Sequence, residues 1–293
     1  IYDHLGGGFF RYTTDRAWRT PYFEKVLCDN AQLLSIFAEA LRLGPDPLFQ
    51  DAISDTIKWL MADMRHAKGG FYASQDALLI QSNETAVGKY YLWRREEVKK
   101  HLKEDEYLLV ETLYGIDRPA NLDNHWSLHR SDSYRSVVER LSMQVDAANQ
   151  LLASAKEKLF LARQQRSAPR TDETILTAWN GLLISGLIEA GTVMQRPDWI
   201  TTAEELADFI FTQCWDGHLL TANWRNSGDR SLGFLDDYAN VLMGLLDLLQ
   251  CRWREQDAAF AVALADAVIS GFYDTDNGGF FFSHKDQEGL IFR

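Results

Sequence analysis

The sequence predicts an all-α fold of stacked helical hairpins, with short β segments gathered at one end of the helices. Apolar residues recur at the three- and four-residue spacing of amphipathic helices through most of the 293 residues. A polar opener, two such helices and a glycine-rich closer also recur, as units of roughly 40 residues, a period typical of stacked supersecondary repeats. We therefore expect neighbouring hairpins to bury their flanks against one another.

The first unit opens at Asp29-Asn30 and closes at Gly69–Tyr72. The apolar face of its first helix carries Leu34, Phe37, Ala38 and Leu41. Gly44-Pro45-Asp46-Pro47 then supplies a helix C-terminus, an N-cap and a proline at the first helical position. A second helix follows, with an apolar face formed by Ile53, Ile57, Leu60, Met61 and Met64.

The remaining helices follow the same logic. Two more units open at Trp179-Asn180 and Asp236-Asp237-Tyr238, and they close at Asp216–Trp224 and Asn277–Ser283. A further pair is predicted from one or two helical pieces in Glu96–Tyr114 and a long helix in Ala148–Ala162, with an ordered polar loop between them. This gives eight long helices in four hairpins.

Short β segments are expected between the hairpins, at residues 4–12, 71–93, 218–232 and 280–292. Because the helices alternate up and down, these segments and the polar openers meet at one end. Helix N-termini concentrate unpaired N–H groups there, and the polar openers are expected to point into the mouth that they surround.

Composition restricts the class of partner. The formal net charge of -12 disfavours nucleic acid and anionic membranes, and charged residues interrupt every long apolar stretch. Cys28, Cys214 and Cys251 are odd in number and far apart, so they form no local redox or zinc motif, and each is expected to be buried and inert. The cysteine usage indicates a reducing compartment, and we expect a cytoplasmic protein. The chain opens at Ile1 without a signal peptide, which indicates a piece of a longer protein.

Several strings in the chain are long and specific. They are IYDHLGGGFFRYTTDRAW, PYFEKVLCDNAQLL, GGFYASQDA, GKYYLW, LTAWNGLLISGL and GFLDDYANVLMGLLDLL. In these strings the chain resembles the spermatogenesis-associated protein 20 family through most of its length. The resemblance implies a thioredoxin-like domain followed by an (α/α)6 toroid of the six-hairpin glycosidase and sugar-epimerase type. Residues 1–293 are then the central part of one toroid domain, an incomplete arc truncated at both ends, and they contain no thioredoxin-like domain.

The chain departs from the family pattern at three positions. Tyr22 stands where the family has histidine, Leu78 where it has the second acid of Asp-Ala-Asp, and Arg170 where it has histidine. Two imidazoles and one carboxylate, all proton-transfer groups, are therefore replaced.

Carboxylates are the predicted catalytic groups, because hydrolysis of a glycosidic bond needs two carboxyl groups facing each other across that bond. The candidates are Asp237, Asp76, Asp29 and Asp172. The structural alternative is that an aspartate at a helix start is an N-cap. If Asp236 is the cap, its neighbour Asp237 is free to face the cavity and should have a raised pKa.

Substrate-binding candidates follow from the way sugars are held, by an aromatic stack and fixed polar groups. They are His4, Arg11, Trp18, Tyr22, Glu24, Asn30, Tyr91, Trp93, Trp179, Asn180, Asp236 and Tyr238. Phe71 and Phe280 in the closers are expected to pack under the β segments. No metal-ligand or dinucleotide-binding spacing occurs, so neither a metal nor a cofactor is expected.

The sequence therefore predicts a carbohydrate-active or carbohydrate-binding domain, glycosidase-like or sugar-epimerase-like, whose partner is a small sugar or glycoside. The surviving acids and aromatic residues favour this function. The three departures favour the alternative, a non-catalytic interaction domain that partners the thioredoxin-like domain of the same longer protein. No nucleic acid or membrane is expected as a partner.

Overall fold

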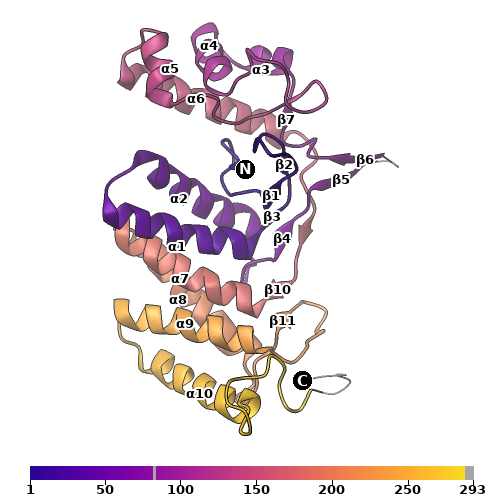
Figure 1. Ribbon diagram of the computed structural model, residues 1–293, viewed down its shortest axis with the longest axis vertical. Helices are drawn as coiled ribbons and strands as arrows, with labels where there is room; N and C mark the ends of the chain where they lie inside the picture. The colour runs from indigo at the N-terminus through magenta and orange to yellow at the C-terminus, as the bar shows by residue number, and fades with distance from the viewer. Residues whose placement is uncertain (82–83, 288–293) are drawn as a thin grey trace. The chain divides into compact units, whose positions relative to one another are not determined.

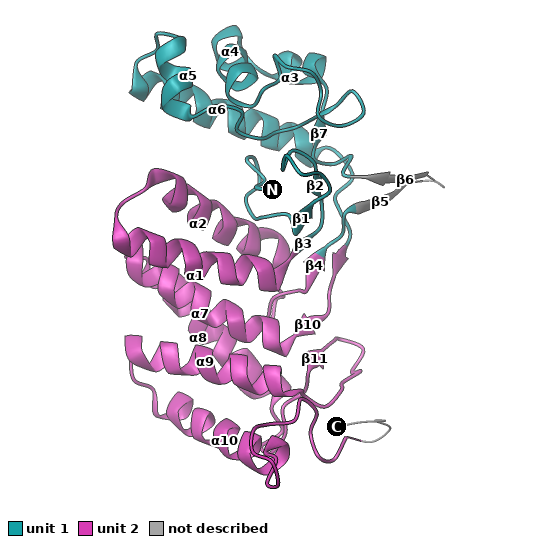
Figure 2. Cartoon of the chain, viewed as in Figure 1, with its two compact units in different colours: residues 1–25, 75–170 teal, residues 26–74, 171–293 magenta. Residues whose placement is uncertain are grey.

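The computed structural model describes residues 1–81 and 84–287, and the chain divides into two compact units (Figure 2). Unit 1 contains residues 1–25 and 75–170, and unit 2 contains residues 26–74 and 171–293. Residues 75–170 thus interrupt the repeat between its first and second hairpins. That residues 1–293 are the central part of one domain stays a prediction.

Unit 2 consists of three helical hairpins, as the three repeats predict (Figure 1). The first helices of the hairpins are α1 (Leu27–Leu43), α7 (Thr177–Val193) and α9 (Leu235–Cys251). The second helices are α2 (Pro47–Trp59), α8 (Pro197–Phe209) and α10 (Glu255–Phe272), and α2 and α8 end in π-helical turns at Leu60–Met64 and Ile210–Cys214. Asp46 caps α2 by accepting from the Leu48 N–H, as its spacing from Pro47 predicts.

The three first helices begin at the same end of unit 2, beside the closers, which confirms the geometry predicted from the repeat. The N–H of Leu27 donates to the carbonyl of Ala73, that of Thr177 to Ala222, and that of Leu235 to Phe282, each at 2.9 Å. The first residue of every such helix is therefore bonded to the closer of its own hairpin or, for Leu27, to the residue directly after it. These bonds satisfy N–H groups that a helix start otherwise leaves without a partner.

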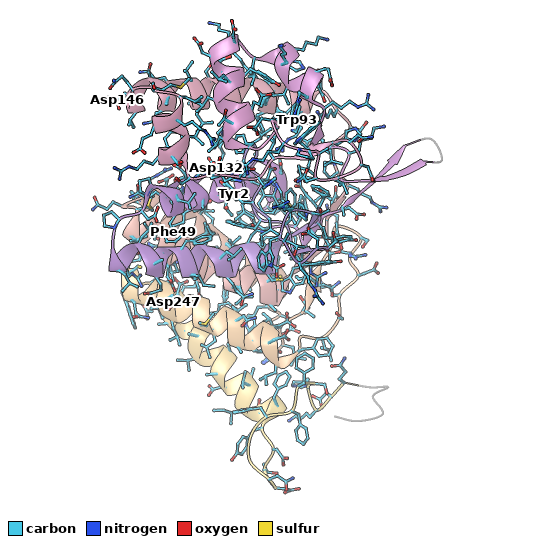
Figure 3. The ribbon with its side chains drawn as sticks, turned by 45° about the horizontal axis from the view of Figure 1, so that its top comes forward. Tyr2, Phe49, Trp93, Asp132, Asp146 and Asp247 are labelled. Carbon is cyan, nitrogen blue, oxygen red and sulfur yellow. The ribbon has the colours of Figure 1, made fainter. Side chains whose placement is uncertain are left out.

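Helix α7 lies between α1 and α9 and is buried around most of its circumference. Side chains bridge it to neighbours along its length. Ser185 Oγ donates to the carboxylate of Asp247 on α9 at 2.6 Å. Asp247 is labelled in Figure 3. On α1, Phe37 stacks on Phe49 of α2 with ring centroids 5.3 Å apart. A continuous apolar core therefore runs through the stack.

Short strands lie next to the helix starts. In unit 2, β10 (Ile175–Leu176) pairs antiparallel with β11 (Asn223–Trp224). Three further strands, β3 (Lys25–Val26), β4 (Ser74–Gln75) and β9 (Thr171–Asp172), fall at or near the unit boundaries in the sequence. Of the predicted β segment at residues 280–292, the isolated bridge between Tyr273 and Phe280 is present, and residues 288–292 lie outside the described part.

Unit 1 contains the two helical pieces and the long helix predicted for the fourth pair, together with one short helix that the sequence did not predict. They are α3 (Arg95–His101), α4 (Glu104–Leu113), the unpredicted α5 (Tyr134–Arg140) and α6 (Val145–Gln164). Its antiparallel strand pairs are β1 (Tyr12–Thr13) with β2 (Pro21–Tyr22), β5 (Leu78–Gln81) with β6 (Glu84–Val87), and β7 (Leu92–Trp93) with β8 (Trp126–Ser127). A separate apolar core packs α4 against α6.

A buried ion cluster fastens the N-terminal segment of unit 1. Asp3 accepts from Arg163 of α6 at 2.7 Å and lies 2.8 Å from the ammonium of Lys25, which also donates to the carbonyl of Gly7. Burial alone would raise the pKa of Asp3, but the two cations hold it well below its usual range. A Cβ on Gly6 would lie 2.2 Å from the Arg163 guanidinium, so the glycine run makes room for the cluster.

All three cysteines were expected to be buried. This is confirmed for Cys214, whereas Cys28 is only half-buried. It is wrong for Cys251, which is exposed because it is the last residue of α9. Among the described residues, none of the helices combines the length and apolarity that crossing a membrane requires.

Candidate functional site

Two of the predicted substrate-binding residues in unit 2 are buried clamps between neighbouring hairpins. Asn180 of α7 accepts from the N–H of Phe71 at 2.8 Å and donates to the carbonyl of the same residue at 3.0 Å. Tyr238, at the equivalent position of α9, accepts from the N–H of Leu220 at 2.8 Å. Each residue thus binds the backbone of the preceding closer, so the expectation that these openers point into a mouth is wrong for both. Buried backbone groups need partners, and these side chains supply them.

Asp237 is also a structural partner of two helix starts. Its Oδ2 accepts from the N–H of Phe234 and its Oδ1 from the N–H of Ala178 at the start of α7, both at 2.8 Å. The sequence assigned the cap to Asp236; the structure reverses the two, because Asp236 is exposed while Asp237 is buried. Burial raises the pKa of Asp237 to about 7, against the effect of its two N–H donors. The raised pKa agrees with the prediction, but the carboxylate does not face open space.

The other unit 2 candidates have local partners. Asp172 accepts from the N–H and the hydroxyl of Thr174, at 3.1 and 2.6 Å, and so closes a turn. Asn30 donates to the carbonyl of Val26 at 2.9 Å, as Asn180 does to that of Leu176. Asp29 lies half-buried in the first turn of α1, where the helix dipole favours a carboxylate. Trp179 packs partly buried against the core of unit 2.

The structure brings three predicted residues of unit 1 together around a fourth, Tyr22. The ring of Tyr22 stacks on Tyr12 with centroids 4.9 Å apart. Burial, then the nearby charges of Glu24 and Asp76, raise the pKa of the Tyr22 phenol. Arg11 pairs with Glu24 at 3.3 Å. The sequence had proposed all four, Arg11, Tyr22, Glu24 and Asp76, but nothing in their spacing required that they meet.

Two of the three positions that depart from the family pattern belong to this neighbourhood. Tyr22 is one, and Arg170 is the other, because its carbonyl accepts from the N–H of Asp76 at 2.8 Å. Both departures therefore lie close to Asp76, Tyr22 through its phenol and Arg170 through its backbone carbonyl.

Trp18 extends the aromatic surface of this region. It is 66% exposed in the loop between β1 and β2, with a left-handed backbone of φ 58°. Asp15 holds that loop by accepting from the N–H groups of Ala17, Arg19 and Thr20. An exposed tryptophan on a loop that is fixed in this way can stack on a sugar face or on a partner protein.

Three other unit 1 candidates are packing residues. Tyr91 and Trp93 are buried. The ring of His4 lies between those of Tyr2 and Tyr114, with centroids 5.0 and 5.1 Å away. Burial, then the charges of Arg130 and Lys156, lower the pKa of His4 to about 3, so its imidazole is neutral near pH 7. None of the three presents a free polar group to a ligand in the way the prediction requires.

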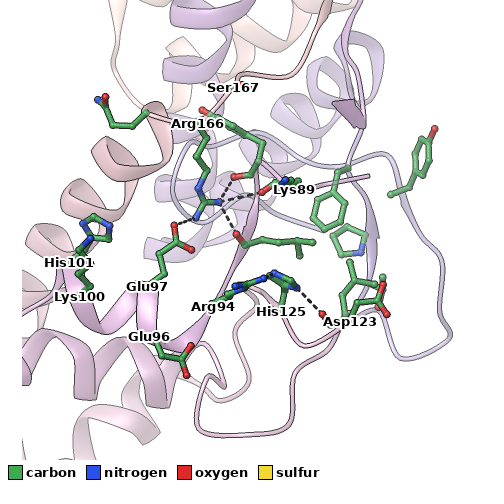
Figure 4. Close-up of a pocket in the computed structure, with 18 of the residues that line it drawn as sticks. Lys89, Arg94, Glu96, Glu97, Lys100, His101, Asp123, His125, Arg166 and Ser167 are labelled. Carbon is green, nitrogen blue, oxygen red and sulfur yellow. Dashed lines mark hydrogen bonds and ion pairs between the residues drawn. The ribbon is translucent and has the colours of Figure 1, made fainter. Parts of the chain in front are cut away.

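A cavity of about 1420 Å³ in unit 1 is lined in part by Tyr22 (Figure 4). Tyr22 and Phe23 line it from β2 and the residue after it, and Thr14 and Thr20 line it from the loop between β1 and β2. Its other lining residues, which the sequence did not single out as a site, include Lys89, Tyr90, Arg94, Glu96, Glu97, Lys100, His101, Asp123, His125 and Arg166. They come from three segments far apart in the sequence, so only the string GKYYLW pointed toward any of them.

Arg166 gives the cavity one fixed wall. Its guanidinium donates to the carbonyls of Tyr90 and Leu92, both at 2.7 Å, and to the carboxylate of Glu97 at 2.6 Å. The same group lies 4.0 Å from the ring centroid of Trp93. All these contacts are structural, so Arg166 stabilises the lining rather than offering donors to a ligand.

A second arginine of the cavity lining, Arg94, is oriented by a single hydrogen bond. The Nε–H of Arg94 donates to Nε2 of His125 at 3.2 Å. Because arginine can only donate, Nε2 accepts, and Nδ1–H of His125 then donates to the carbonyl of Asp123 at 2.8 Å. The two terminal nitrogens of Arg94, which lines the cavity, have no hydrogen-bond partner among the described residues. The carboxylates of Glu96 and Asp123 have no ion-pair partner within the described part of the chain.

The four predicted catalytic acids do not line this cavity. Asp76 belongs to unit 1 and lies near Tyr22, whereas Asp29, Asp172 and Asp237 belong to unit 2. In residues 1–81 and 84–287 no group of three or more histidine, cysteine, aspartate or glutamate side chains is arranged to hold a metal ion.

The fold and its repeats place the chain among the (α/α)6 toroid proteins. Its fold is similar to that of cellobiose 2-epimerase from Bacillus thermoamylovorans, with a TM-score of 0.57 and 11% identity, over 97% of this chain and 54% of that one. At this identity the likeness concerns the fold alone. No protein-family model matches the chain.

Within that fold class the chain is homologous to spermatogenesis-associated protein 20, which confirms the resemblance found in the sequence. It is 32% identical to the human protein and 33% identical to the rat protein, over 98% of its own length in both cases. It spans 40% of the length of these relatives.

Proposed function

We propose that this chain binds a small sugar or glycoside in the unit 1 cavity, at Tyr22. The observation that carries the proposal is the position of Tyr22, which lines the cavity and also lies beside the carboxylates of Glu24 and Asp76. An aromatic face next to fixed polar groups is the usual arrangement for holding a sugar. The toroid fold that the chain shares with a cellobiose 2-epimerase supports a carbohydrate as the ligand class, by analogy of fold.

The contacts of the lining residues indicate which role each of them has in this site. Tyr22 and Phe23 supply apolar faces, and Arg94, Glu96 and Asp123 supply polar atoms that no group within residues 1–81 and 84–287 occupies. Asp76 is the acid that we assign to proton transfer, because among the predicted catalytic residues its charge is the one that acts on the cavity-lining Tyr22. Asp237 is not assigned this role, since both of its oxygens accept from backbone N–H groups.

Calorimetric titration with cellobiose, D-mannose and D-glucose tests the binding. We expect Tyr22→Ala to weaken binding at least tenfold, about 1.4 kcal/mol, which is within the range for losing a stacked aromatic ring. Tyr273→Ala is the matched control, because Tyr273 is an exposed tyrosine of unit 2. Failure of all three sugars to bind at millimolar concentration, or equal loss in the two variants, would contradict the proposal.

Turnover is tested separately, by following the same sugars by NMR for epimerised or hydrolysed product. If the chain is an enzyme, Asp76→Asn abolishes product formation while binding persists. Binding without product in the unmodified protein would identify a carbohydrate-binding domain instead of an enzyme.

The second candidate function is a non-catalytic interaction domain. The observation in its favour is that Asp237, Asn180 and Tyr238, three of the residues predicted to act on a substrate, are occupied by backbone groups. The expected partner is the thioredoxin-like domain implied by the family resemblance. Co-purification of that domain with this chain, together with absence of sugar binding, would favour this function over the first.

A further inference from the structure

The net negative charge of the chain comes entirely from unit 2. Unit 1 contains 19 lysine and arginine residues against 17 aspartate and glutamate residues, which gives a net charge of +2. Unit 2 contains 11 against 25, which gives -14 and accounts for the total of -12. The unit 1 cavity therefore lies in the part of the chain whose charge does not oppose an anionic ligand.

The lining of the cavity also carries more positive than negative charge. Four lysine or arginine and three aspartate or glutamate side chains line it. Arg166 and Glu97 form an ion pair at 2.6 Å, so their charges cancel. The three cations and two carboxylates that remain are Lys89, Arg94, Lys100, Glu96 and Asp123. The unpaired part of the lining is therefore net positive.

The three remaining cations are accessible. All of them are exposed, and none has an ion-pair partner among the described side chains. Exposed charges attract an anion only weakly unless they are held in position. The orientation of each cation therefore decides which of them can define a binding site.

Arg94 is the cation that is held in position. Its Nε–H donates to Nε2 of His125 at 3.2 Å, and Nδ1–H of His125 donates to the carbonyl of Asp123 at 2.8 Å (Figure 4). The two terminal nitrogens of the guanidinium remain as a planar pair of donors. Such a pair matches two oxygens of a carboxylate or a phosphate group. Because His125 already orients the side chain, less conformational entropy is lost when an anion binds.

The cavity has room for an anionic group beside a sugar ring. Its volume is about 1420 Å³. Pockets for small ligands usually measure roughly 300–1,000 Å³. Tyr22 lines the cavity from β2, and Arg94 lines it from the residue before α3. The volume therefore accommodates a sugar stacked on Tyr22 together with a charged substituent at Arg94.

We propose that the ligand of the unit 1 cavity is an anionic sugar, and that the terminal nitrogens of Arg94 bind its phosphate or carboxylate group. This proposal rests on the carbohydrate site proposed above and names the ligand class of that site. Lys89 and Lys100 add attraction for the anion. Glu96 and Asp123 can only accept hydrogen bonds when ionised, so they suit the hydroxyl groups of the sugar.

Calorimetric titration with D-glucose, D-glucose 6-phosphate and D-glucuronate tests the proposal. We expect one of the two anionic sugars to bind at least about tenfold more tightly than glucose, because hydrogen bonds to a charged group are the stronger ones. The anionic sugar that shows this preference identifies the group as a phosphate or a carboxylate. The preference should shrink when NaCl is raised from about 0.05 to about 0.5 M, because salt screens exposed charges.

A pair of variants shows whether Arg94 causes the preference. Arg94→Gln should bring the ratio of the affinities for the anionic sugar and for glucose close to one. Arg135→Gln is the matched control and should leave this ratio unchanged. Arg135 is an exposed arginine of the same unit, and it is not among the described residues that line the cavity. An equal loss of preference in both variants would refute the role of Arg94.

The titrations distinguish failure of this proposal from failure of the carbohydrate site. Binding of glucose with no preference for either anionic sugar would overturn the anionic ligand and leave the carbohydrate site in place. Binding of none of the three sugars would overturn both. Inorganic phosphate is the remaining probe. If it binds as tightly as glucose 6-phosphate, and Tyr22→Ala changes neither affinity, the cavity binds the anion without the sugar and the proposal is wrong.

Discussion

Replacing Asp237 by asparagine tests whether the buried carboxylate at the start of α9 is a structural cap. The carboxylate now accepts two backbone N–H groups, one from Phe234 and one from Ala178, each at 2.8 Å. An asparagine side chain has one accepting oxygen and one donating nitrogen. It can keep one of the two bonds, but its NH2 group, itself a donor, then faces the other backbone N–H and cannot accept from it.

The expected loss follows from the cost of that second N–H. A buried donor left without an acceptor costs about 1–3 kcal/mol, and a lost helix cap about 1 kcal/mol. For a chain of this size such a loss lowers the melting temperature by about 2–5 °C. Asp236→Asn is the matched control, because Asp236 is the exposed neighbour, and it should change stability by less than about 0.5 kcal/mol.

The pH dependence gives a second, independent signature. Burial raises the pKa of Asp237 to about 7 from an ordinary value of 3.8. Between these values the folded state binds the proton that the unfolded state has released, so the free energy of unfolding falls as pH rises from about 4 to about 7. A shift of this size corresponds to at most about 4 kcal/mol. In Asp237→Asn this contribution disappears, so the deficit of the variant should narrow as pH rises.

Urea denaturation of the unmodified protein and the two variants at pH 5 and pH 8 measures both effects. A deficit that is equal at the two pH values would refute the raised pKa. An unchanged midpoint together with loss of sugar turnover would refute the structural assignment and return Asp237 to the catalytic role predicted from the sequence.

Three further predictions follow from buried contacts. Asn180→Ala should lower the free energy of unfolding by about 2–4 kcal/mol, measured in urea, because it strips both backbone partners from Phe71. Gly244→Ala should cost about 1–3 kcal/mol, whereas Gly44→Ala, with nothing within 4 Å of the added Cβ, should be neutral or stabilising; equal melting temperatures would contradict the packing. Asp3→Asn should cost about 3–5 kcal/mol at pH 7. Because its pKa is lowered, Asp3 stabilises the fold above about pH 4 and loses this contribution as pH falls below that value. The free energies of unfolding of the unmodified protein and of Asp3→Asn should therefore converge in acid.

The candidate site divides into residues that sequence could name and residues that it could not. Tyr22, Glu24 and Asp76 were recognisable because they fall in specific strings and are chemically suited to a sugar. Arg94, His125 and Arg166 were not, since each is an ordinary residue in a polar segment and becomes a cavity wall only when those segments meet. Asp237 was named correctly as unusual but for the wrong reason, because which of two adjacent aspartates caps a helix depends on the neighbouring helix start.

The sequence by itself determined the helical hairpins of unit 2 and their common orientation. Apolar spacing, helix-end signals and the recurring closer are local patterns, and three repetitions of one pattern require equivalent packing. Only the tertiary structure decided that Asn180 and Tyr238 bind the backbone of the preceding closer, and that residues 75–170 form a unit with its own core. Those outcomes depend on which buried N–H and carbonyl groups lack a partner after the helices have packed, and that information exists only between segments distant in the chain.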